Sequence, residues 1–254
     1  MVKLTALIIT YNEIIHIDGL IENLSFANEI IFVDSFSTDG TFEKLNKIEK
    51  VKVYQHEFEN FAKQKNYALS LSSNDWVLFI DADERITNEY KNDIIKKINS
   101  HNNYVAYNSL FRYYFGKIPI KYSGFQTTKS YRLIRVSKCF YDESRTVHER
   151  LIVNGDSGLL KYRIIHYSFR NYEHYKEKMK LYAHLKAKKL HKEGKKVTFF
   201  KSKIKPIYRF FNHYIIRLGI LDGMVGFYIS KLNAYEVIER YRELDRLNKK
   251  SFSK

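Results

Sequence analysis

The first part of the chain alternates short apolar runs with amphipathic helical patterns. The runs LTALIIT, EIIFVD, VKVYQ and WVLFID begin near residues 4, 29, 51 and 75. Between them, residues 14–26 and 59–72 carry apolar side chains at the three- and four-residue spacing of one helix face. Apolar strands that alternate with helices imply a parallel sheet covered on both faces, with right-handed crossovers. We therefore predict an α/β fold with a mostly parallel central sheet.

The rest of the chain changes from mixed to helical patterns. We expect Thr87 or Asn88 to begin a helix, and aromatic, strand-like segments follow at residues 104–115 and 131–136. From about residue 171 the pattern is mostly helical, and Pro206 is expected to separate two helices. The predicted architecture is an α/β part followed by an α-helical part.

Polar side chains gather where three of the predicted strands end. TYNE (Thr10 to Glu13) follows the first strand, DSFSTDGT (Asp34 to Thr41) the second, and DADE (Asp81 to Glu84) the fourth. In an open α/β sheet, ligands bind outside the carboxyl ends of the strands, where several loops converge. One pocket can therefore collect all three loops.

The DADE loop places two carboxylates where a buried strand stops. Asp81 and Asp83 are two residues apart, so on an extended chain they point to the same side. Like charges that close repel unless solvent screens them or a cation lies between them. Two carboxylates with phosphate oxygens and water suit Mg²⁺ or Mn²⁺, which favour hard oxygen ligands.

Two further polar groups each have a functional and a structural interpretation. Asp34 can accept hydrogen bonds from a base or a ribose hydroxyl, but aspartates in such loops are also turn formers and helix caps. Gln64, Lys65 and Asn66 share the polar side of a predicted helix, where they can contact a diphosphate and a ribose. A solvated helix face is the structural alternative.

Charge is distributed unevenly along the chain. Residues 1–158 contain 20 Lys or Arg and 20 Asp or Glu, whereas residues 159–254 contain 24 and 8, so the whole net charge of +16 lies in the second part. This division favours chemistry in the neutral part and docking of the cationic part to an anionic partner.

The basic part, residues 171–216, interleaves Lys and Arg with Tyr and Phe. This pattern is compatible with single-stranded nucleic acid, through phosphate contacts and stacking. It is equally compatible with amphipathic helices on an anionic membrane, or with aromatic packing beneath a solvated lysine face.

Cysteine usage and hydropathy bear on the compartment. The single cysteine, Cys139, excludes an internal disulfide and a cysteine-based zinc cluster, and it fits a reducing compartment. The first apolar run, residues 4–10, is too short for a signal peptide, and no apolar window of about 18 residues is free of charge. We expect no spanning helix and a cytoplasmic location.

The segments ALIITYNE, IIFVDSFSTDGT, AKQKNYAL and WVLFIDADER, in this order and spacing, resemble the glycosyltransferase family 2 domain over residues 3–90. SRTVHERL and LDGMVGFYIS are similar to the branch that contains bacterial lipopolysaccharide and lipooligosaccharide core β-1,4-glucosyltransferases. The resemblance implies a GT-A fold, a UDP-hexose donor with glucose as the expected sugar, and Mg²⁺ or Mn²⁺ as cofactor.

The resemblance also implies roles for individual residues. It puts a nucleotide-sugar site at Thr10, Glu13, Asp34, Gln64, Lys65, Asn66 and Asp81, with Asp34 near the uracil and Asp81 by the ribose. Asp83 would hold the metal. Many family members show a late Glu-Asp pair as catalytic base, whereas here the candidate is Glu149 within VHER. His148, Arg150 and His166 are candidate contacts to the acceptor or the diphosphate.

The implied domains are a GT-A catalytic domain at residues 1–168 and a basic amphipathic helical region at 169–254. Residues 1–90 would bind the nucleotide-sugar and residues 91–168 the acceptor. Direct displacement with Glu149 as base would invert the anomeric centre. Polymerisation is disfavoured because Trp76, the only tryptophan, lies in a strand and not in the Gln-x-x-Arg-Trp motif of processive members.

The expected acceptor is a lipid-linked lipopolysaccharide or lipooligosaccharide core. The basic helices would hold the enzyme at the cytoplasmic face of the inner membrane. One alternative is a family 2 enzyme that acts on capsule, a teichoic-type polymer or protein. A nucleotidyltransferase is disfavoured because TYNEIIHIDG lacks a glycine-rich basic loop after the first strand. A nucleic-acid-binding protein leaves the acidic strand-end loops unexplained.

Overall fold

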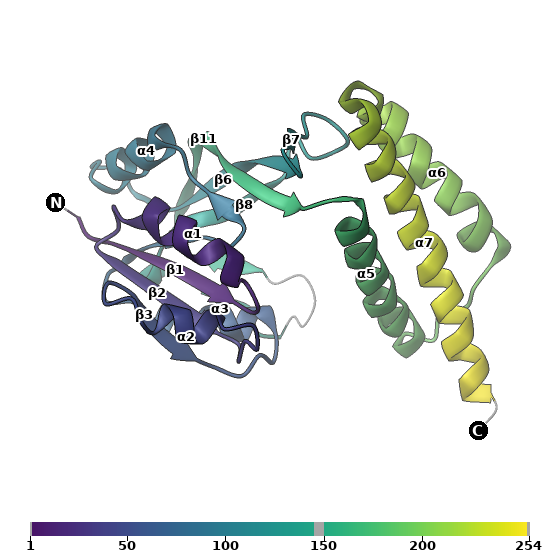
Figure 1. The fold of residues 1–254 in the computed structure, drawn as a ribbon, viewed down its shortest axis with the longest axis horizontal. Helices are drawn as coiled ribbons and strands as arrows, with labels where there is room; N and C mark the ends of the chain where they lie inside the picture. Colours follow the sequence, from purple (N-terminus) through teal and green to yellow (C-terminus); the bar gives the residue numbers. More distant parts are fainter. Residues whose placement is uncertain (1, 145–149, 253–254) are drawn as a thin grey trace. The chain divides into compact units, whose positions relative to one another are not determined.

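The computed structural model describes residues 2–144 and 150–252. The chain forms two compact units. The N-terminal unit comprises Met1–Phe111 and Lys129–His166, and the C-terminal unit comprises Arg112–Thr128 and Tyr167–Lys254. Figure 1 shows the elements of each unit. The functional division predicted at residue 168 stays a prediction.

A mixed β-sheet forms the centre of the N-terminal unit, with strand order β3-β2-β1-β4-β8-β6-β11-β5. Four neighbouring strands are parallel, as predicted: β1 (Leu4–Thr10), β2 (Glu29–Asp34), β3 (Lys52–Gln55) and β4 (Trp76–Phe79). Antiparallel pairing begins where β8 (Lys129–Arg135) joins β4 and β6 (Tyr104–Phe115) joins β8. The sheet ends with β11 (Asp156–Phe169) and the short β5 (Glu84–Arg85).

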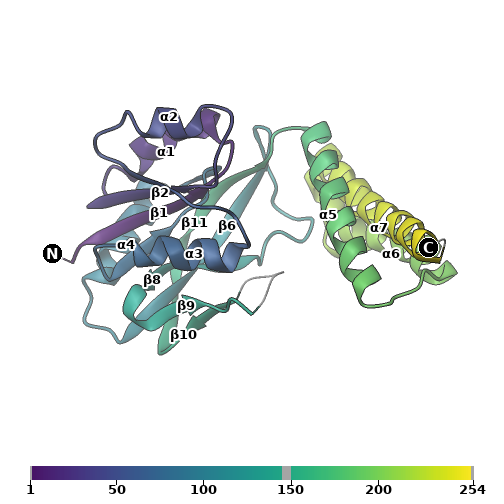
Figure 2. The ribbon, with the colours of Figure 1, turned by 90° about the horizontal axis from the view of Figure 1, so that it is seen from below.

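Helices cover both faces of the parallel strands. Helices α1 (Ile17–Leu24) and α2 (Thr41–Leu45) lie on one face and α3 (Phe61–Ser70) lies on the other (Figure 2). Right-handed crossovers require this arrangement, because the chain moves outward from β1 to β3 and then returns to β4. A single turn, η1 (Ile14–His16), precedes α1.

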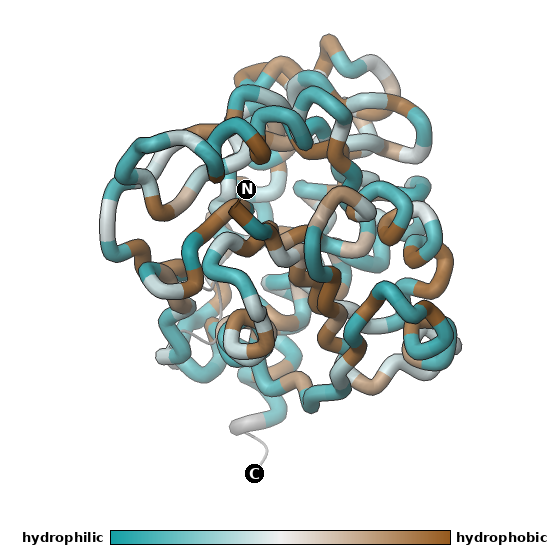
Figure 3. Tube along the Cα trace, turned by 90° about the vertical axis from the view of Figure 1, so that its left-hand side faces the viewer, coloured by the Kyte–Doolittle hydropathy of each residue, from teal (hydrophilic) through white to brown (hydrophobic). Residues whose placement is uncertain are grey.

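The apolar runs form the core of this unit. Leu7, Ile31 and Val77 of the strands pack with Ala62 and Ala68 of α3, and all five are buried. Hydrophobic residues (brown) and hydrophilic residues (teal) are interspersed along the trace of the chain (Figure 3). As predicted, Thr87 caps α4 (Asn88–Ile98), because its side chain accepts a hydrogen bond from the Tyr90 amide.

A small hairpin lies against α3. It consists of β9 (Cys139–Tyr141) and β10 (Leu151–Val153), which pair in antiparallel fashion, and it follows the short turn η2 (Val136–Lys138). Residues 145–149, between its strands, lie outside the described residues. Sequence periodicity did not predict this hairpin, since each strand has only three residues.

The C-terminal unit is mostly helical. Helix α7 (Gly223–Phe252) lies between α5 (Tyr172–Lys192) and α6 (Lys205–Phe211), and both pack against it (Figure 1). Phe169, Tyr175, Ile229 and Leu232 form part of its buried core. Its elements are β7 (Ile118–Pro119), α5 (Tyr172–Lys192), η3 (Phe200–Ile204), α6 (Lys205–Phe211), η4 (Asn212–Ile216), η5 (Gly219–Asp222) and α7 (Gly223–Phe252).

Pro206 does not divide two helices as predicted. It lies in the first turn of α6, where a missing N–H costs little, directly after the π-helical turn η3. The π-helical turn therefore accommodates Pro206 without ending the helix. No helix among the described residues is long and apolar enough to cross a membrane.

Candidate active site

The ends of β1 and β2 bring Thr10 and Asp34 together as register partners. Both residues are buried. The Asp34 carboxylate accepts a hydrogen bond from the Ser37 amide at 2.9 Å and one from Gln55 Nε2, at the end of β3, at 3.4 Å. Within the described part of the chain, Thr10 Oγ1 is buried without a hydrogen-bond partner. This edge thus holds an acceptor and an unsatisfied hydroxyl side by side.

The loops after β1 and β2 are fastened to each other by hydrogen bonds. The Asn12 amide donates to Ser37 Oγ at 2.8 Å, and the Thr38 amide donates to Asn12 Oδ1 at 2.8 Å. The Glu13 amide donates to Thr41 Oγ1 at 3.0 Å. The Glu13 carboxylate lies 3.8 Å from His16 Nε2. The two loops therefore form one polar wall.

Asp39 has a structural role in the loop after β2. Its carboxylate accepts hydrogen bonds from the Ile14 amide at 3.1 Å and the Thr41 amide at 3.0 Å. Although burial acts in the opposite direction, these hydrogen bonds and that from the Thr41 hydroxyl lower the pKa of Asp39. The Asp39 carboxylate therefore links the start of η1 to the start of α2.

Helix α3 contributes buried polar groups and not a solvated face. Gln64 is fully buried, and its Nε2 donates to Ser35 Oγ at 3.1 Å and to the His56 carbonyl at 3.3 Å. Lys65 is 9% exposed, and its ammonium lies 5.1 Å from the centre of the Tyr141 ring. Gln64 thus joins the loops after β2 and β3, while Lys65 points toward the hairpin.

Asn66 holds the hairpin strand β9 in place. Its Nδ2 donates to the Tyr141 carbonyl at 2.9 Å and to the Glu143 carboxylate at 2.7 Å, and its Oδ1 accepts from the Tyr141 amide at 2.7 Å. These contacts use both ends of the side-chain amide. The structure therefore places Asn66 in a positioning role for Tyr141, beside the lysine that precedes it.

Asp81 is paired with an arginine that sequence analysis did not single out. Arg132 Nη2 of β8 lies 2.7 Å from Asp81 Oδ2 and 2.5 Å from Glu84 Oε1. Burial opposes ionisation of Asp81, but the charges of Arg132 and Lys65 outweigh it and hold the pKa of this carboxyl well below its usual range. Asp81 is therefore an anion beside a guanidinium.

Glu84 lies deeper than Asp81 and is fully buried. Its Oε2 accepts a hydrogen bond from the Asp81 amide at 3.0 Å. Burial raises the pKa of Glu84 to about 7. The positive charge of Arg132 lowers this pKa, and the negative charge of Asp81 raises it. The two acids that share Arg132 thus differ widely in acidity.

Asp83 faces a different partner. The chain turns after β4, and the Glu84 amide donates to the Asp81 carbonyl at 2.9 Å, so the two aspartates do not continue an extended strand. Asp83 lies 3.2 Å from His166 Nε2 of β11, and His166 Nδ1 lies 3.5 Å from Glu84. Burial opposes protonation of His166, but Asp83 and Glu84 outweigh it and raise the histidine pKa.

Asp83 is the residue of this loop that would hold a hard divalent cation together with substrate oxygens. Asp83 retains a side chain that is 24% exposed, and His166 lies beside it. No group of three or more His, Cys, Asp or Glu side chains is arranged to hold a metal by itself within residues 2–144 and 150–252. Mg²⁺ is often held by one or two carboxylates together with substrate phosphates, and such a site needs no protein cage.

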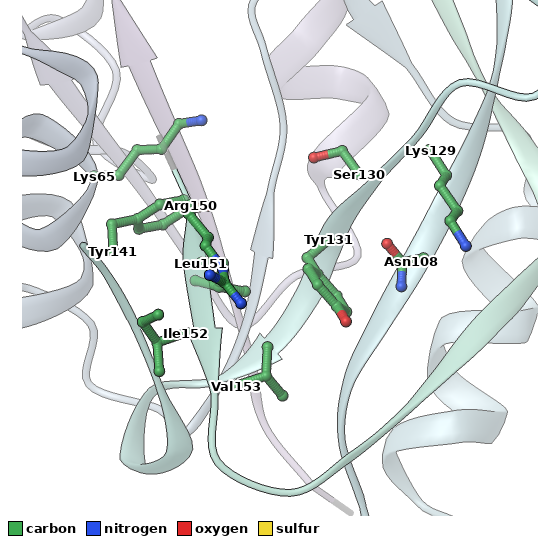
Figure 4. A pocket seen from close by; sticks show the side chains of 10 residues that line it. All are labelled: Lys65, Asn108, Lys129, Ser130, Tyr131, Tyr141, Arg150, Leu151, Ile152 and Val153. Atoms are coloured by element: carbon green, nitrogen blue, oxygen red, sulfur yellow. The ribbon is translucent and has the colours of Figure 1, made fainter. Parts of the chain in front are cut away.

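A pocket of about 600 Å³ lies between α3, the hairpin and the strands β6 and β8. Lys65, Tyr141 and Arg150 line one side, and Lys129 and Asn108 line the other (Figure 4). No acidic side chain is among the described residues that line it. The full lining is Lys65, Asn108, Lys129, Ser130, Tyr131, Tyr141, Arg150, Leu151, Ile152 and Val153.

Two predicted site residues, His148 and the candidate base Glu149, lie outside the described residues. Arg150 follows them and lines the pocket. Sequence reasoning missed Arg132 and Lys129. Arg132 stands beside the apolar pair Leu133 and Ile134 in a predicted strand, and this was the available signal, because a charge in a buried strand requires a partner.

The site is built on loops at the carboxyl ends of parallel strands, and the family model described as Glycosyl transferase family 2 matches residues 5–154. The chain belongs to this family. The matched range includes the loops that follow β1, β2 and β4 of the transferase. The predicted family and the predicted GT-A class of α/β fold are confirmed.

Similarity to individual transferases extends over almost the whole chain. The transferase is 32% identical over 271 residues to an uncharacterized glycosyltransferase of Rickettsia typhi, covering 99% of this chain and 89% of that protein. It is 28% identical to the lipopolysaccharide core biosynthesis glycosyltransferase LpsC of Rhizobium meliloti, covering 94% and 93%. A solved structure of S. aureus TarS residues 1–349 with UDP covers 95% of this chain and 91% of that chain, at 18% identity and a TM-score of 0.49.

Proposed function

We propose that this glycosyltransferase moves a hexose, glucose in the first instance, from a UDP-sugar to a lipid-linked lipopolysaccharide or lipooligosaccharide core, with inversion at the anomeric carbon. One observation carries the proposal. The acids that follow the parallel strands β2 and β4 lie at the same edge of the sheet, and Lys65, whose charge acts on Asp81, lines a cationic pocket large enough for a sugar.

The nucleotide half of the donor is assigned to the polar wall at β1 and β2. Asp34 would accept a hydrogen bond from the uracil, and Thr10 Oγ1 would gain the partner that it lacks. Glu13 and Asp81 would face the ribose. Gln64 and Asn66 support this wall and the hairpin, as their hydrogen bonds indicate. Lys65 would offset charge on the diphosphate.

Asp83 is the proposed protein ligand for Mg²⁺ or Mn²⁺, with His166 beside it. When bound, such an ion neutralises negative charge on the departing UDP, as metals do in phosphoryl transfer. Arg132 keeps Asp81 ionised and holds its carboxylate in an ion pair, whereas Asp83 lies beside His166.

Glu149 is the proposed base that takes the proton of the acceptor hydroxyl, and His148 a proposed contact to acceptor or diphosphate. Arg150, the next residue in the chain, lines the sugar-sized pocket, which supports an acceptor role for this segment. Attack opposite the leaving group gives a β-linkage from an α-linked donor, without a covalent sugar–enzyme intermediate.

The electrostatics of the pocket support an anionic acceptor. Lys65, Lys129 and Arg150 contribute positive charge at its wall, and the tyrosines at positions 131 and 141 offer faces for sugar rings. A phosphorylated, lipid-linked core oligosaccharide has matching chemistry. The similarity to LpsC, a lipopolysaccharide core biosynthesis glycosyltransferase, supports the same acceptor class.

We place the enzyme on the cytoplasmic face of the inner membrane, as a peripheral protein held by its basic C-terminal helices. The lipid-linked acceptor would be reached there. The excess of positive charge in residues 159–254 supports contact with an anionic surface, at about 1 kcal/mol per basic residue near the headgroups.

The decisive experiment is a UDP-release screen across donor sugars with Mg²⁺ or Mn²⁺. The wild type should release UDP with one donor, and Asp83→Ala and Glu149→Gln should each lose most of that activity. Asp156→Ala, which removes an exposed acid at the start of β11, is the matched control and should behave as wild type. Absence of donor binding by the wild type would refute the proposal, and full activity of Glu149→Gln would move the base elsewhere.

A further inference from the structure

An unusual apolar face occurs on the C-terminal unit, within residues 199–224. Ile204, Ile207, Phe211 and Ile215 recur every three or four residues, and all four are exposed. The opposite side of the same helical path carries Pro206 and His213, which are buried. A helix that is apolar on its solvent side as well as on its packed side is typical of a buried or membrane-associated element.

The apolar face continues beyond this stripe. Phe199 and Phe200 precede it, at 74% and 66% exposure, and Leu221 and Met224 follow it around η5. Single exposed apolar side chains are common on proteins, but a contiguous group of this size marks an interaction surface. Among the described residues of this unit, α5 presents a smaller exposed apolar group, which consists of Leu181, Tyr182 and Leu185.

The charge around the apolar face indicates the chemistry of its partner. Between Glu193 and Asp222 the chain contains seven Lys or Arg residues and no Asp or Glu. Lys195, Lys196 and Lys203 are exposed, so their ammonium groups can reach lipid phosphates while apolar neighbours insert. A second copy of the chain is a poor match, because a two-fold interface would bring these like charges together.

We propose that the apolar face of residues 199–224 inserts into the interface of an anionic phospholipid bilayer. The proposal rests on the proposed function for the choice of a membrane as the partner. It assigns the membrane contact to α6, its flanking π-helical turns and η5. The lysine-rich helix α5 adds long-range attraction but does not insert.

Vesicle flotation with the full chain tests the proposal. The wild type should bind vesicles of phosphatidylethanolamine and phosphatidylglycerol more tightly than vesicles of phosphatidylcholine. Ile207→Ser with Phe211→Ser should weaken binding at least about tenfold, because each change removes an inserted apolar side chain. Leu181→Ser with Leu185→Ser removes two exposed leucines from α5 and should bind as wild type. Equal binding by the first double variant and the wild type would overturn the proposal.

Tryptophan fluorescence provides a second, direct readout. Trp76 is the only native tryptophan and is buried in the N-terminal unit, so it supplies a constant background. In Phe211→Trp, brominated phospholipid vesicles should quench the new emission, whereas the wild-type emission should be unchanged. Absence of quenching in a Phe211→Trp protein that still binds vesicles would show that this residue does not insert.

Two further measurements separate docking from the alternatives. Light scattering should find the same mass for the wild type and the Ile207/Phe211 double variant. A wild-type dimer that the double variant loses would overturn the proposal in favour of self-association.

UDP release without vesicles should be equal in both proteins. Vesicle binding by a wild type that cleaves no UDP-sugar would refute the proposed function and leave the docking inference standing.

Discussion

Arg132 Nη2 lies 2.7 Å from Asp81 Oδ2, although the two residues are 51 positions apart in the chain. The same nitrogen contacts the buried Glu84. This arrangement uses Asp81 as the partner of a buried cation and leaves Asp83 to face His166. Two aspartates that look equivalent in the sequence therefore have different electrostatic surroundings.

Removal of Arg132 should be among the more costly single changes in the N-terminal unit. Arg132→Met leaves Asp81 and Glu84 without their cation, and we expect a loss of about 3 kcal/mol in the free energy of unfolding. Urea unfolding measures it. The double variant Arg132→Met with Glu84→Gln should recover part of the loss, because the buried acid no longer needs a cation. A single variant as stable as wild type would show that the ion pair adds little.

The cationic pocket should govern acceptor affinity and not donor cleavage. Arg150→Gln and Lys129→Gln should each raise the KM for an anionic acceptor about tenfold, since a charge-assisted contact contributes roughly 1.5 to 3 kcal/mol. The KM for the UDP-sugar should be unchanged. Lys138→Gln, an exposed lysine outside the pocket, is the control. A rise in donor KM alone would assign the pocket to the diphosphate.

Glu29 should make the stability of the fold depend on pH. Burial by itself would raise its pKa, but hydrogen bonds from Lys52, Thr5 and Ser73 outweigh burial and lower the pKa of Glu29 to about 2. Because the folded-state pKa lies below the unfolded-state value, the stabilisation is present above about pH 4.5 and is lost as pH falls toward 2.

Glu29→Gln should therefore lower the free energy of unfolding by about 2 kcal/mol near neutral pH. Its difference from wild type should shrink between about pH 4.5 and 2. Urea titrations at several pH values measure this, and Glu49→Gln, an exposed acid, serves as the comparison. A difference that stays constant with pH would contradict the assigned ionisation.

A close backbone contact in the C-terminal unit should not tolerate a side chain. A Cβ atom at Gly226 would lie 1.7 Å from the Gly219 carbonyl oxygen, so η5 packs directly against the α7 backbone. Gly226→Ala should lower the free energy of unfolding by about 3 kcal/mol. Gly194→Ala has open space but a φ of +65°, and it should cost only about 1 kcal/mol. Thermal unfolding distinguishes the two, and equal losses would mean that η5 relaxes freely.

Much of the N-terminal unit was predictable because its signals are local. Apolar runs located β1 to β4, and three- and four-residue spacing located α1 and α3. The cap at Thr87 located the start of α4. The hairpin β9–β10 escaped because three-residue strands leave no periodicity, and the role of Asn66 escaped because its partner Tyr141 is 75 residues away.

The sequence by itself determined which residues stand at the carboxyl ends of the parallel strands, since periodicity and chain order decide where a strand stops. Only the tertiary structure decided their partners. Arg132 and His166 reach the DADE loop from β8 and β11, strands placed there by sheet pairing over tens of residues. It also decided that the exposed side of residues 204–215 is apolar, because burial depends on which helix face meets α7 and not on spacing alone.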